Sequence, residues 1–296
     1  MKKFMITCYV LTIVFFVSGF TMLGIAVMKK GPSVIDATQK KTLEVIGMLD
    51  KNVTVRFGKK PVEGSELTTL KGQESMSFSK DEIQGLNVEI GAGKLFIVAS
   101  EDESVHVKNA SSGNCIVYVE NGILHVETMN GTSIGANITE IGENGLNVDV
   151  NMPTGEVYLY LPADASFREA ELSLGAGTLK SDVACVVEEL ELEVAAGEMT
   201  LTNMEASDFT CKIGAGRLNY TGAVLANADV ECGMGEAKLT LDGAQSDYDY
   251  ALDVAAGEVA VGDKTYSGLA GSFSIDNNAD KKVNVVCAVG KVVLEF

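Results

Sequence analysis

Apolar and polar residues alternate with a period of two along most of the chain from Asp81 to the C-terminus. In stretches such as "LELEVAAGEMTL" and "FTCKIGAGRLNY", one alternating run ends at a glycine-containing turn and a second alternating run follows. Successive side chains of a strand point to opposite faces, so each run predicts a β-strand with one apolar face. Each unit is therefore predicted to be a strand, a tight glycine turn and a second strand.

The units align when the last glycine of each turn serves as the reference. Around Gly197, for example, apolar residues stand at Leu192 and Val194 before the turn and at Met199 and Leu201 after it. The same columns recur around the other reference glycines, Gly93, Gly177, Gly216, Gly235, Gly257 and Gly290, and "PTGEVYLYLP" around Gly155 resembles a degenerate copy.

The spacing of the units predicts how they stack. From Gly177 to Gly257 the reference glycines lie 20, 19, 19 and 22 residues apart. Parallel coils need such a near-constant length if equivalent residues are to lie one strand spacing, about 4.8 Å, apart. We therefore predict an all-β fold, a parallel β-solenoid (β-helix) of about 20-residue repeats over residues 81–296. A chain of antiparallel hairpins is the alternative, because a short loop with glycine also closes a hairpin.

Both ends of the repeat region differ from its middle. Residues 81–162 are less regular and are interpreted as an N-terminal cap and first coil, with a β-hairpin at Asn121-Gly122, whereas residues 163–296 hold the regular repeats. Gly290 follows Gly257 by 33 residues, and the additional "TYSGLAGSFSIDNNADKK" is expected to form a loop on one face.

The N-terminal segment has the composition of a membrane anchor. Residues 4–28 contain no charged residue and have two lysines on each side, and 25 apolar or neutral residues exceed the roughly 20 that span a bilayer. We predict an uncleaved transmembrane signal anchor over residues 1–30, rather than a cleaved signal peptide. Residues 31–80 lack a sustained period and are predicted to be a stalk or linker. The C-terminal domain is predicted to be extracytoplasmic on a single-pass protein of the cell membrane.

Net charge narrows the choice of partners. The chain has 41 acidic and 23 basic residues, for a formal net charge of -18, which argues against nucleic acid or an anionic membrane surface as the partner of the folded part. Tryptophan is absent, which lowers the odds of a lectin, although eight Tyr and eleven Phe leave that possibility open.

The glycine motifs are interpreted as scaffold rather than as phosphate loops. A dinucleotide fingerprint needs a third glycine and a following helix, but here a strand pattern follows the glycine. Glycine instead provides backbone angles that other residues resist and lets stacked turns approach closely. No catalytic, cofactor-binding or metal-binding residue is predicted, and hydrolase chemistry is not expected.

The cysteines and histidines fit structural positions. Cys211, Cys232 and Cys287 occupy apolar columns, and Cys185 lies where the next unit has Met204, so they are predicted to be buried free thiols rather than disulfides or metal ligands. His106 and His125 each lie between two apolar residues, so their side chains are expected on the outer face of their strands.

Charged residues also follow the repeat. The column after the glycine reads Glu198, Arg217, Glu236 and Glu258, and the column between the inner residues reads Glu193, Lys212, Glu231 and Asp253. The first three of each predict alternating acid–base ladders. The adjacent acids of each column, and "DNNAD" at residues 276–280, admit a calcium site or a solvated surface and turn, and the second interpretation is favoured.

Taken together, the apolar N-terminus, "YLYLPADASFREAELSLGAGTLKS", "ECGMGEAKLTL" and "GDKTYSGLAGSFSIDNNADKK" resemble the bacterial "putative adhesin" family, a cell-envelope domain of unknown function with Gly-Ala-Gly repeats. The resemblance covers about residues 78–296 and implies a β-solenoid outside the membrane. It implies a non-enzymatic adhesin or envelope-binding module whose partner is an envelope glycan, cell surface or membrane protein. Because some relatives accompany envelope-stress signalling proteins, an accessory or scaffold protein of such a system is the alternative.

Overall fold

In a computed structural model of the protein, the described residues are 68–128, 155–267 and 270–296, together with the backbone of four further strands. The chain separates into two compact units, one formed by Met1–Gly58 with Ser133–Asn151 and the other by Lys59–Thr132 with Met152–Phe296. Within the described part of the chain, no helix is long and apolar enough to cross a membrane. The anchor predicted at residues 1–30 lies outside that part.

The smaller unit contains an antiparallel sheet in the order β1-β2-β9-β10. Its strands are β1 (Val45–Ile46), β2 (Asn52–Arg56), β9 (Ser133–Gly142) and β10 (Gly145–Asn151). These residues were expected to belong to the stalk and to the N-terminal cap. They instead form a sheet of their own, because β2 pairs with a segment inserted much later in the chain.

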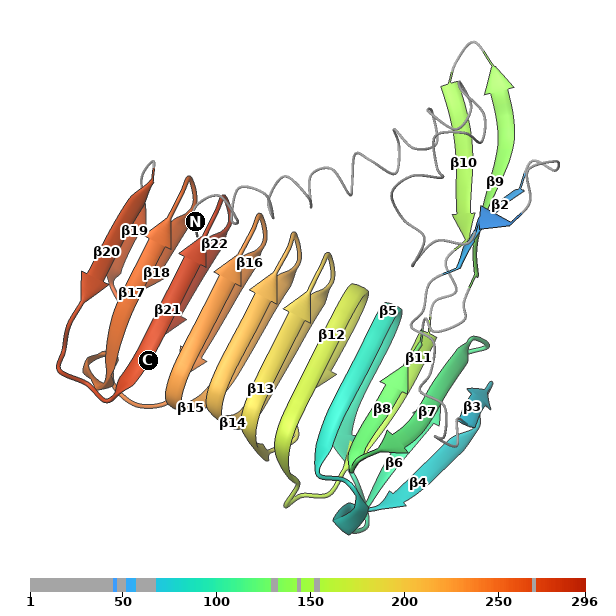
Figure 1. The fold of residues 1–296 in the computed structure, drawn as a ribbon, viewed down its shortest axis with the longest axis horizontal. Helices are drawn as coiled ribbons and strands as arrows, with labels where there is room; N and C mark the ends of the chain where they lie inside the picture. The colour runs from blue at the N-terminus through green and yellow to red at the C-terminus, as the bar shows by residue number, and fades with distance from the viewer. Residues whose placement is uncertain are drawn as a thin grey trace. The chain divides into compact units, whose positions relative to one another are not determined.

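The larger unit is a solenoid-like stack of coils built from one sheet, whose described strands number 18 (Figure 1). Each coil has a strand segment before the glycine turn and one after it, so the stack has two faces. The strands of the regular coils are β5 (Gly85–Ala99), β12 (Ser166–Ser181), β13 (Cys185–Val194), β14 (Glu198–Ile213), β15 (Arg217–Cys232), β16 (Glu236–Leu241), β17 (Tyr248–Val254), β18 (Glu258–Val261), β21 (Lys281–Cys287) and β22 (Lys291–Glu295).

Equivalent residues of neighbouring coils pair in parallel and in register. Glu198 pairs with Arg217, and Arg217 pairs with Glu236, one full repeat apart each time. The predicted parallel stacking is therefore confirmed for β12–β16, and the hairpin alternative is wrong there. Asn203, with a φ of 63°, lies where β14 bends from one face to the other.

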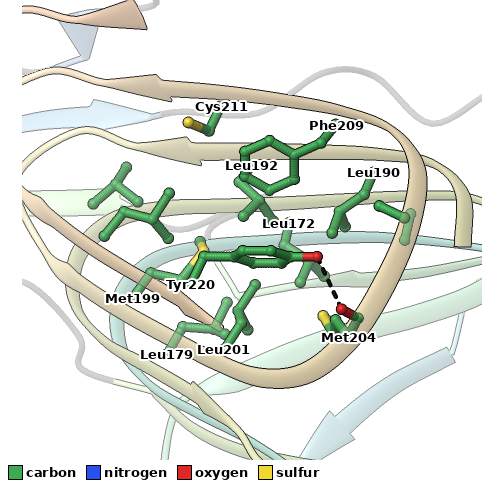
Figure 2. Close-up of a cluster of buried hydrophobic side chains, with 14 of the residues drawn as sticks. Leu172, Leu179, Leu190, Leu192, Met199, Leu201, Met204, Phe209, Cys211 and Tyr220 are labelled. Carbon is green, nitrogen blue, oxygen red and sulfur yellow. Dashed lines mark hydrogen bonds between the residues drawn. The ribbon is translucent and has the colours of Figure 1, made fainter. Parts of the chain in front are cut away.

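The core lies between the two faces of the stack (Figure 2). Leu192 and Leu201 come from opposite faces and are fully buried, and full burial of such a side chain contributes about 1.5–3 kcal/mol. The Phe209 and Tyr220 rings pack across the interior with centroids 4.7 Å apart. The Tyr220 hydroxyl donates a hydrogen bond to the Met204 carbonyl oxygen at 2.9 Å, so the buried phenol has a partner.

The reference glycines lie against the backbone of the neighbouring coil. A Cβ atom on Gly235 would lie 2.1 Å from the carbonyl oxygen of Gly216, and one on Gly290 would lie 2.3 Å from that of Gly235. Gly93 and Gly177 also have φ values of 131° and 115°, which L side chains rarely adopt. Close approach therefore explains the glycine column throughout, and the backbone angle is a second reason at two positions.

The coils do not stack in sequence order. β21 pairs in parallel with both β15 and β17, and β22 pairs with both β16 and β18. In Figure 1 the red β21–β22 coil accordingly lies between β16 and the orange β17–β18 coil. The spatial order of the glycines is Gly155, Gly93, Gly177, Gly197, Gly216, Gly235, Gly290, Gly257.

Additional strands cover both ends of the stack, with antiparallel pairing at one end and mixed pairing at the other. At the C-terminal end, β19 (Lys264–Ser267) pairs with β18 and β20 (Gly271–Ile275) pairs with β17. The expected loop in this segment is thus mostly a cap, because its strands pair with the edge of the last coil. At the other end the strands are β3 (Thr68–Lys71), β4 (Ser75–Ser79), β6 (Ser104–Asn109), β7 (Asn114–Glu120), β8 (Ile123–Glu127) and β11 (Gly155–Leu161).

The N-terminal end of the stack confirms one prediction and corrects another. The expected hairpin is confirmed, since β7 and β8 pair antiparallel around Asn121 and Gly122, both with positive φ. β3 and β4 join the same sheet, so it begins at Thr68 rather than at Asp81. Each of these short strands has one buried apolar residue, Leu70 and Phe78, which is too few to show as an alternation.

Candidate functional site

The glycine turns do not offer a phosphate site. Their amides are already used, since Ala196 donates to the Gly175 carbonyl oxygen and Met234 donates to that of Gly214, at 2.9 and 2.7 Å. A phosphate loop needs free amides pointing at the ligand. The scaffold interpretation of the turns therefore has a direct structural cause, because these turns bond to the turn of a neighbouring coil.

A shallow groove of 720 Å³ follows these turns from Gly177 to Lys291. Two apolar side chains at its edge, Met234 and Val289, are 46% and 57% exposed. Its walls are mostly backbone and small side chains, with the charged row described below along one side. The groove thus provides a surface without a converging set of polar groups.

The charged column after the glycine alternates in sign because the β21–β22 coil lies between the β16 coil and the β17–β18 coil. Lys291 lies between Glu236 and Glu258, and its Nζ atom is 2.9 Å from Glu258 Oε1. Arg217 Nε lies 3.2 Å from Glu236 Oε2. Glu236 and Glu258 are therefore not neighbours, and the calcium interpretation of this pair is wrong.

The β21–β22 coil also separates the two acids of the second charged column, the column between the inner residues. Val286 separates Glu231 from Asp253, so these acids are not adjacent either. Lys212 lies beside Glu193 in the strand register, but its ammonium forms an ion pair with Glu191, two residues earlier on β13. The predicted alternation of Glu193, Lys212 and Glu231 is in register, but the ion pair of Lys212 forms with Glu191, outside the column.

At residues 276–280, "DNNAD" forms a turn that Asp249 holds through its side chain. Asp249 Oδ1 accepts hydrogen bonds from the amides of Asn277 and Ala279, at 2.7 and 3.2 Å. The segment joins β20, which is antiparallel to β17, to β21, which is parallel to β17, so the chain reverses direction here.

The described cysteines are buried free thiols, as predicted: Cys115, Cys185, Cys211, Cys232 and Cys287. Burial raises the pKa of Cys115 to about 12 and that of Cys185 to about 11. Cys232 and Cys287 occupy the same row of adjacent coils. The raised pKa keeps the Cys115 and Cys185 thiols protonated and unreactive, which agrees with a packing role.

Both histidines lie on the outer face of their strands, as predicted. His106 is hydrogen-bonded through Nδ1 to Ser77 Oγ at 2.7 Å and through Nε2 to Asp102 Oδ1 at 2.8 Å. The bond to His106 lowers the pKa of the Asp102 carboxyl. The ring of His125 stacks on Tyr118 with centroids 4.4 Å apart. Each imidazole is thus held by neighbours on its own face.

A cluster of aromatic rings lies beside His106 on the face formed by β6, β11, β5 and β12. We name Phe96, Tyr158 and Tyr160 the aromatic platform. Phe96 and Tyr158 are stacked, with centroids 5.2 Å apart and planes inclined by 26°, and Tyr160 continues the row at 6.3 Å. All three rings are partly exposed and point away from the core. His106 meets the last ring edge-on at 6.2 Å.

Lysines flank the aromatic platform on two sides. Lys108 pairs with Tyr158 across β6–β11, and Lys180 pairs with Phe96 across β12–β5. Neither lysine forms an ion pair among the described residues, in contrast to Lys212, Arg217, Lys238 and Lys291. The Tyr158 hydroxyl donates to Glu156 Oε1 at 2.9 Å, which raises the pKa of that phenol.

Sequence reasoning missed this platform. Phe96 and Tyr158 are 62 positions apart in the numbering, and the parallel pairing of β5 with β11 brings them together. The sequence did indicate that the rings face outward, because Phe96 and Tyr158 alternate with buried residues such as Leu95 and Val157.

Comparison with protein families agrees with this architecture. The family model described as Toastrack DUF4097 matches residues 83–280. The chain belongs to this family. The sequence resemblance is therefore confirmed at the level of the family, and the Toastrack match includes β5–β20 with the aromatic platform. Among proteins with curated descriptions, none matches the chain.

Solved structures similar to this Toastrack protein share little sequence with it. A "putative cell adhesion protein" from Clostridium sporogenes is 15% identical, with 78% of this chain and 99% of that chain covered and a TM-score of 0.33. A "putative adhesin" from Bacteroides fragilis is 10% identical, with coverage of 80% and 100% and a TM-score of 0.27. A "putative lipid binding protein" from Parabacteroides distasonis is 12% identical, with coverage of 78% and 97% and a TM-score of 0.32.

Proposed function

We propose that this protein is a non-enzymatic, membrane-anchored, extracytoplasmic module that binds a component of the bacterial cell envelope, as an adhesin does. The observation that carries the proposal is the aromatic platform. Its rings lie on the outer face of the sheet, and the core inside β5 and β11 is complete without them. Partly exposed rings on the outer face, beside lysines without ion pairs among the described residues, support a role in recognition.

The anchor in this proposal is the uncharged segment at residues 4–28. Its length supports a bilayer span, and a single span would tether the repeat domain to the outer side of the cell membrane. The tether would place the binding face within reach of envelope polymers without requiring a soluble partner.

The test is cross-linking of the full-length protein in the cells that make it, with identification of the attached material. Recovery of wall polymer or surface material supports the binding module. Recovery of a defined set of membrane proteins instead would overturn it in favour of an accessory role in envelope-stress signalling. Exchange of residues 1–30 for an unrelated transmembrane helix gives a second readout, because envelope binding should survive the exchange and a helix-dependent partner should be lost.

A further inference from the structure

Two buried cysteines, Cys232 and Cys287, face each other across neighbouring coils. They lie directly opposite each other in the parallel pairing of β15 with β21. Both thiols are free, and both side chains belong to the core, with exposed fractions of 2% and 1%. The intercalated coil is the cause of this pairing, because in sequence order β17 would lie beside β15 and place Val254 opposite Cys232.

The separation of the two residues suits a disulfide bond. Neighbouring strands lie about 4.8 Å apart, and the Cα atoms that a disulfide joins are usually about 4.4–6.8 Å apart. Cys211 is a poorer partner for Cys232, because it pairs with Val230, one strand away and two positions along. That offset corresponds to a Cα separation of about 8 Å, beyond the reach of a disulfide.

Both sulfur atoms contact the turn at Gly290. Cys232 Sγ lies 3.8 Å from the Lys291 carbonyl oxygen, and a Cβ atom on Gly290 would lie 2.6 Å from it, so this sulfur leans toward the coil of Cys287. Cys287 Sγ lies 3.1 Å from the Gly290 carbonyl oxygen. It leans onward to Gly257 in the next coil, so a rotation about the Cα–Cβ bond of Cys287 is needed to turn its sulfur back to Cys232.

The turns beside these thiols also line the shallow groove. Gly235 and Gly290 are among the groove residues, and their carbonyl oxygens lie 3.2 and 3.1 Å from the sulfur atoms of Cys232 and Cys287. Each thiol is thus in contact with a glycine that faces the groove. A small oxidant therefore has a short path to the pair, although both side chains are buried.

The two thiols differ in acidity. The neighbouring Cys232 thiol lowers the pKa of Cys287, and Cys287 in turn raises the pKa of Cys232. Because the thiolate is the reactive form of cysteine, Cys287 is the sulfur that reacts first. Cys232 keeps its proton until the second step.

From this arrangement we propose that a peroxide converts Cys232 and Cys287 into a reversible disulfide bond that holds the C-terminal coil to β15. The Cys287 thiolate attacks one peroxide oxygen, so that a sulfur–oxygen bond forms and the oxygen–oxygen bond breaks. The hydroxide that leaves takes up the proton lost by Cys287. This inference is independent of the proposed envelope-binding function.

The second step closes the bond. The Cys232 sulfur attacks the sulfenic acid on Cys287, so that the sulfur–sulfur bond forms and the sulfur–oxygen bond breaks. The departing hydroxide combines with the proton of Cys232 as water. In all, the two thiols are oxidised by two electrons and hydrogen peroxide is reduced to two molecules of water.

The disulfide should be easily reduced. Paired residues of parallel strands have Cβ atoms about one strand spacing apart, about 4.8 Å, whereas an unstrained disulfide has a Cβ separation of about 3.5–4.5 Å. A strained disulfide has a more oxidising potential. Dithiothreitol should therefore reopen this bond without denaturant.

The experiment treats the full-length protein in detergent micelles with hydrogen peroxide, blocks the remaining thiols with iodoacetamide and maps the peptides by mass spectrometry without reduction. A linked peptide pair with Cys232 and Cys287 is expected, while Cys115, Cys185 and Cys211 carry the blocking group. Blocked Cys232 and Cys287, or their oxidation to sulfinic acids without a link, would overturn the proposal. The link should form faster in the folded protein than in concentrated urea, and equal rates would also overturn it.

Variants test whether the bond holds the coil. Oxidised parent protein should unfold at a higher urea concentration than reduced parent protein, and dithiothreitol should remove the difference. Cys232→Ala should lose both the link and the peroxide-dependent shift. Cys211→Ala is the matched control, since it removes a buried thiol from the next strand, and it should behave like the parent. Absence of the shift in the parent, or its persistence in Cys232→Ala, would overturn this role. Thermal unfolding of each reduced variant checks that it folds.

Discussion

Lys238 Nζ lies 2.9 Å from Glu295 Oε1, although the chain passes through the whole β17–β20 segment between these two residues. The contact exists because β22 occupies the place beside β16 that a strictly sequential solenoid would give to β18. The pair is therefore a marker for the intercalation of the C-terminal coil.

The first prediction tests that intercalation. Lys238→Glu and Glu295→Lys should each lower stability, and the charge-swapped double variant should recover most of the loss. The coupling energy should be at most about 1 kcal/mol and should shrink in high salt, because both side chains are half exposed. A double-mutant cycle by urea unfolding measures it, with Lys264→Glu/Glu295→Lys as the control pair. A repulsive coupling, or one that does not shrink in high salt, would contradict the contact.

The glycine column should tolerate no side chain. Gly235→Ala places a Cβ atom 2.1 Å from the Gly216 carbonyl oxygen and 2.6 Å from Ile213 Cγ2, so neighbouring turns must separate. We expect a loss of about 3 kcal/mol or more in the free energy of unfolding. Gly113→Ala is the matched control, since its nearest atom would be 3.5 Å away, and it should change stability by less than about 1 kcal/mol. Similar losses for both would argue against close approach as the cause.

The Tyr220 hydroxyl should contribute to stability from inside the core. It donates to the Met204 carbonyl oxygen at 2.9 Å and also lies 3.1 Å from that of Ala223. Tyr220→Phe removes this donor and should cost about 1–2 kcal/mol in urea unfolding. Tyr118→Phe loses a bond to the Glu127 carboxylate on the outer face and should cost less than about 0.5 kcal/mol. A loss for Tyr118→Phe as large as that for Tyr220→Phe would contradict the role of the buried hydroxyl.

Alkaline pH should destabilise the protein through its buried thiols. The pKa of Cys115 rises from an ordinary value of 9.0 to about 12, and that of Cys185 rises to about 11, because burial disfavours the thiolate. A raised pKa means that the stability is intact below the unfolded value and is lost as pH rises from about 9 towards the folded value. Each thiol should remove about 1.4 kcal/mol per pH unit in that window.

The check is the pH dependence of the free energy of unfolding between pH 9 and pH 11. Cys115→Val/Cys185→Val should show a shallower decline than the parent, because valine has no proton to lose. Deprotonation of the lysines affects both proteins equally and cancels in the comparison. Parallel curves would mean that the thiols ionise as easily in the folded protein as in the unfolded one.

The sequence specifies the repeat unit better than the arrangement of the units. Alternation around Gly197 or Gly216 is local, so strands and turns could be predicted from it. Every coil has the same apolar columns, however, and those columns do not state which coil is the neighbour of which. The charges do carry that information: Lys291 between Glu236 and Glu258 gives an alternating row, whereas sequence order places two acids together.

The aromatic platform could not be predicted from the sequence for a related reason. Phe96 is in a strand predicted from its own repeat, and Tyr158 is in the degenerate copy around Gly155. Only the parallel pairing of β11 with β5, with the smaller unit's β9 and β10 inserted before β11, places the rings side by side. Non-local pairing of this kind depends on the total burial of the sheet and leaves no local pattern.

The position of β21 and β22 also bears on how the molecule is made. Among the strands of the stack these two are synthesised last, yet they separate two coils synthesised earlier, so the core cannot be completed until Glu295 has left the ribosome. Until then β15–β16 and β17–β18 each lack their parallel neighbour, and unpaired strand edges invite association with other chains. A nascent chain stopped at Asp280 would therefore have two open edges rather than being a solenoid one coil shorter.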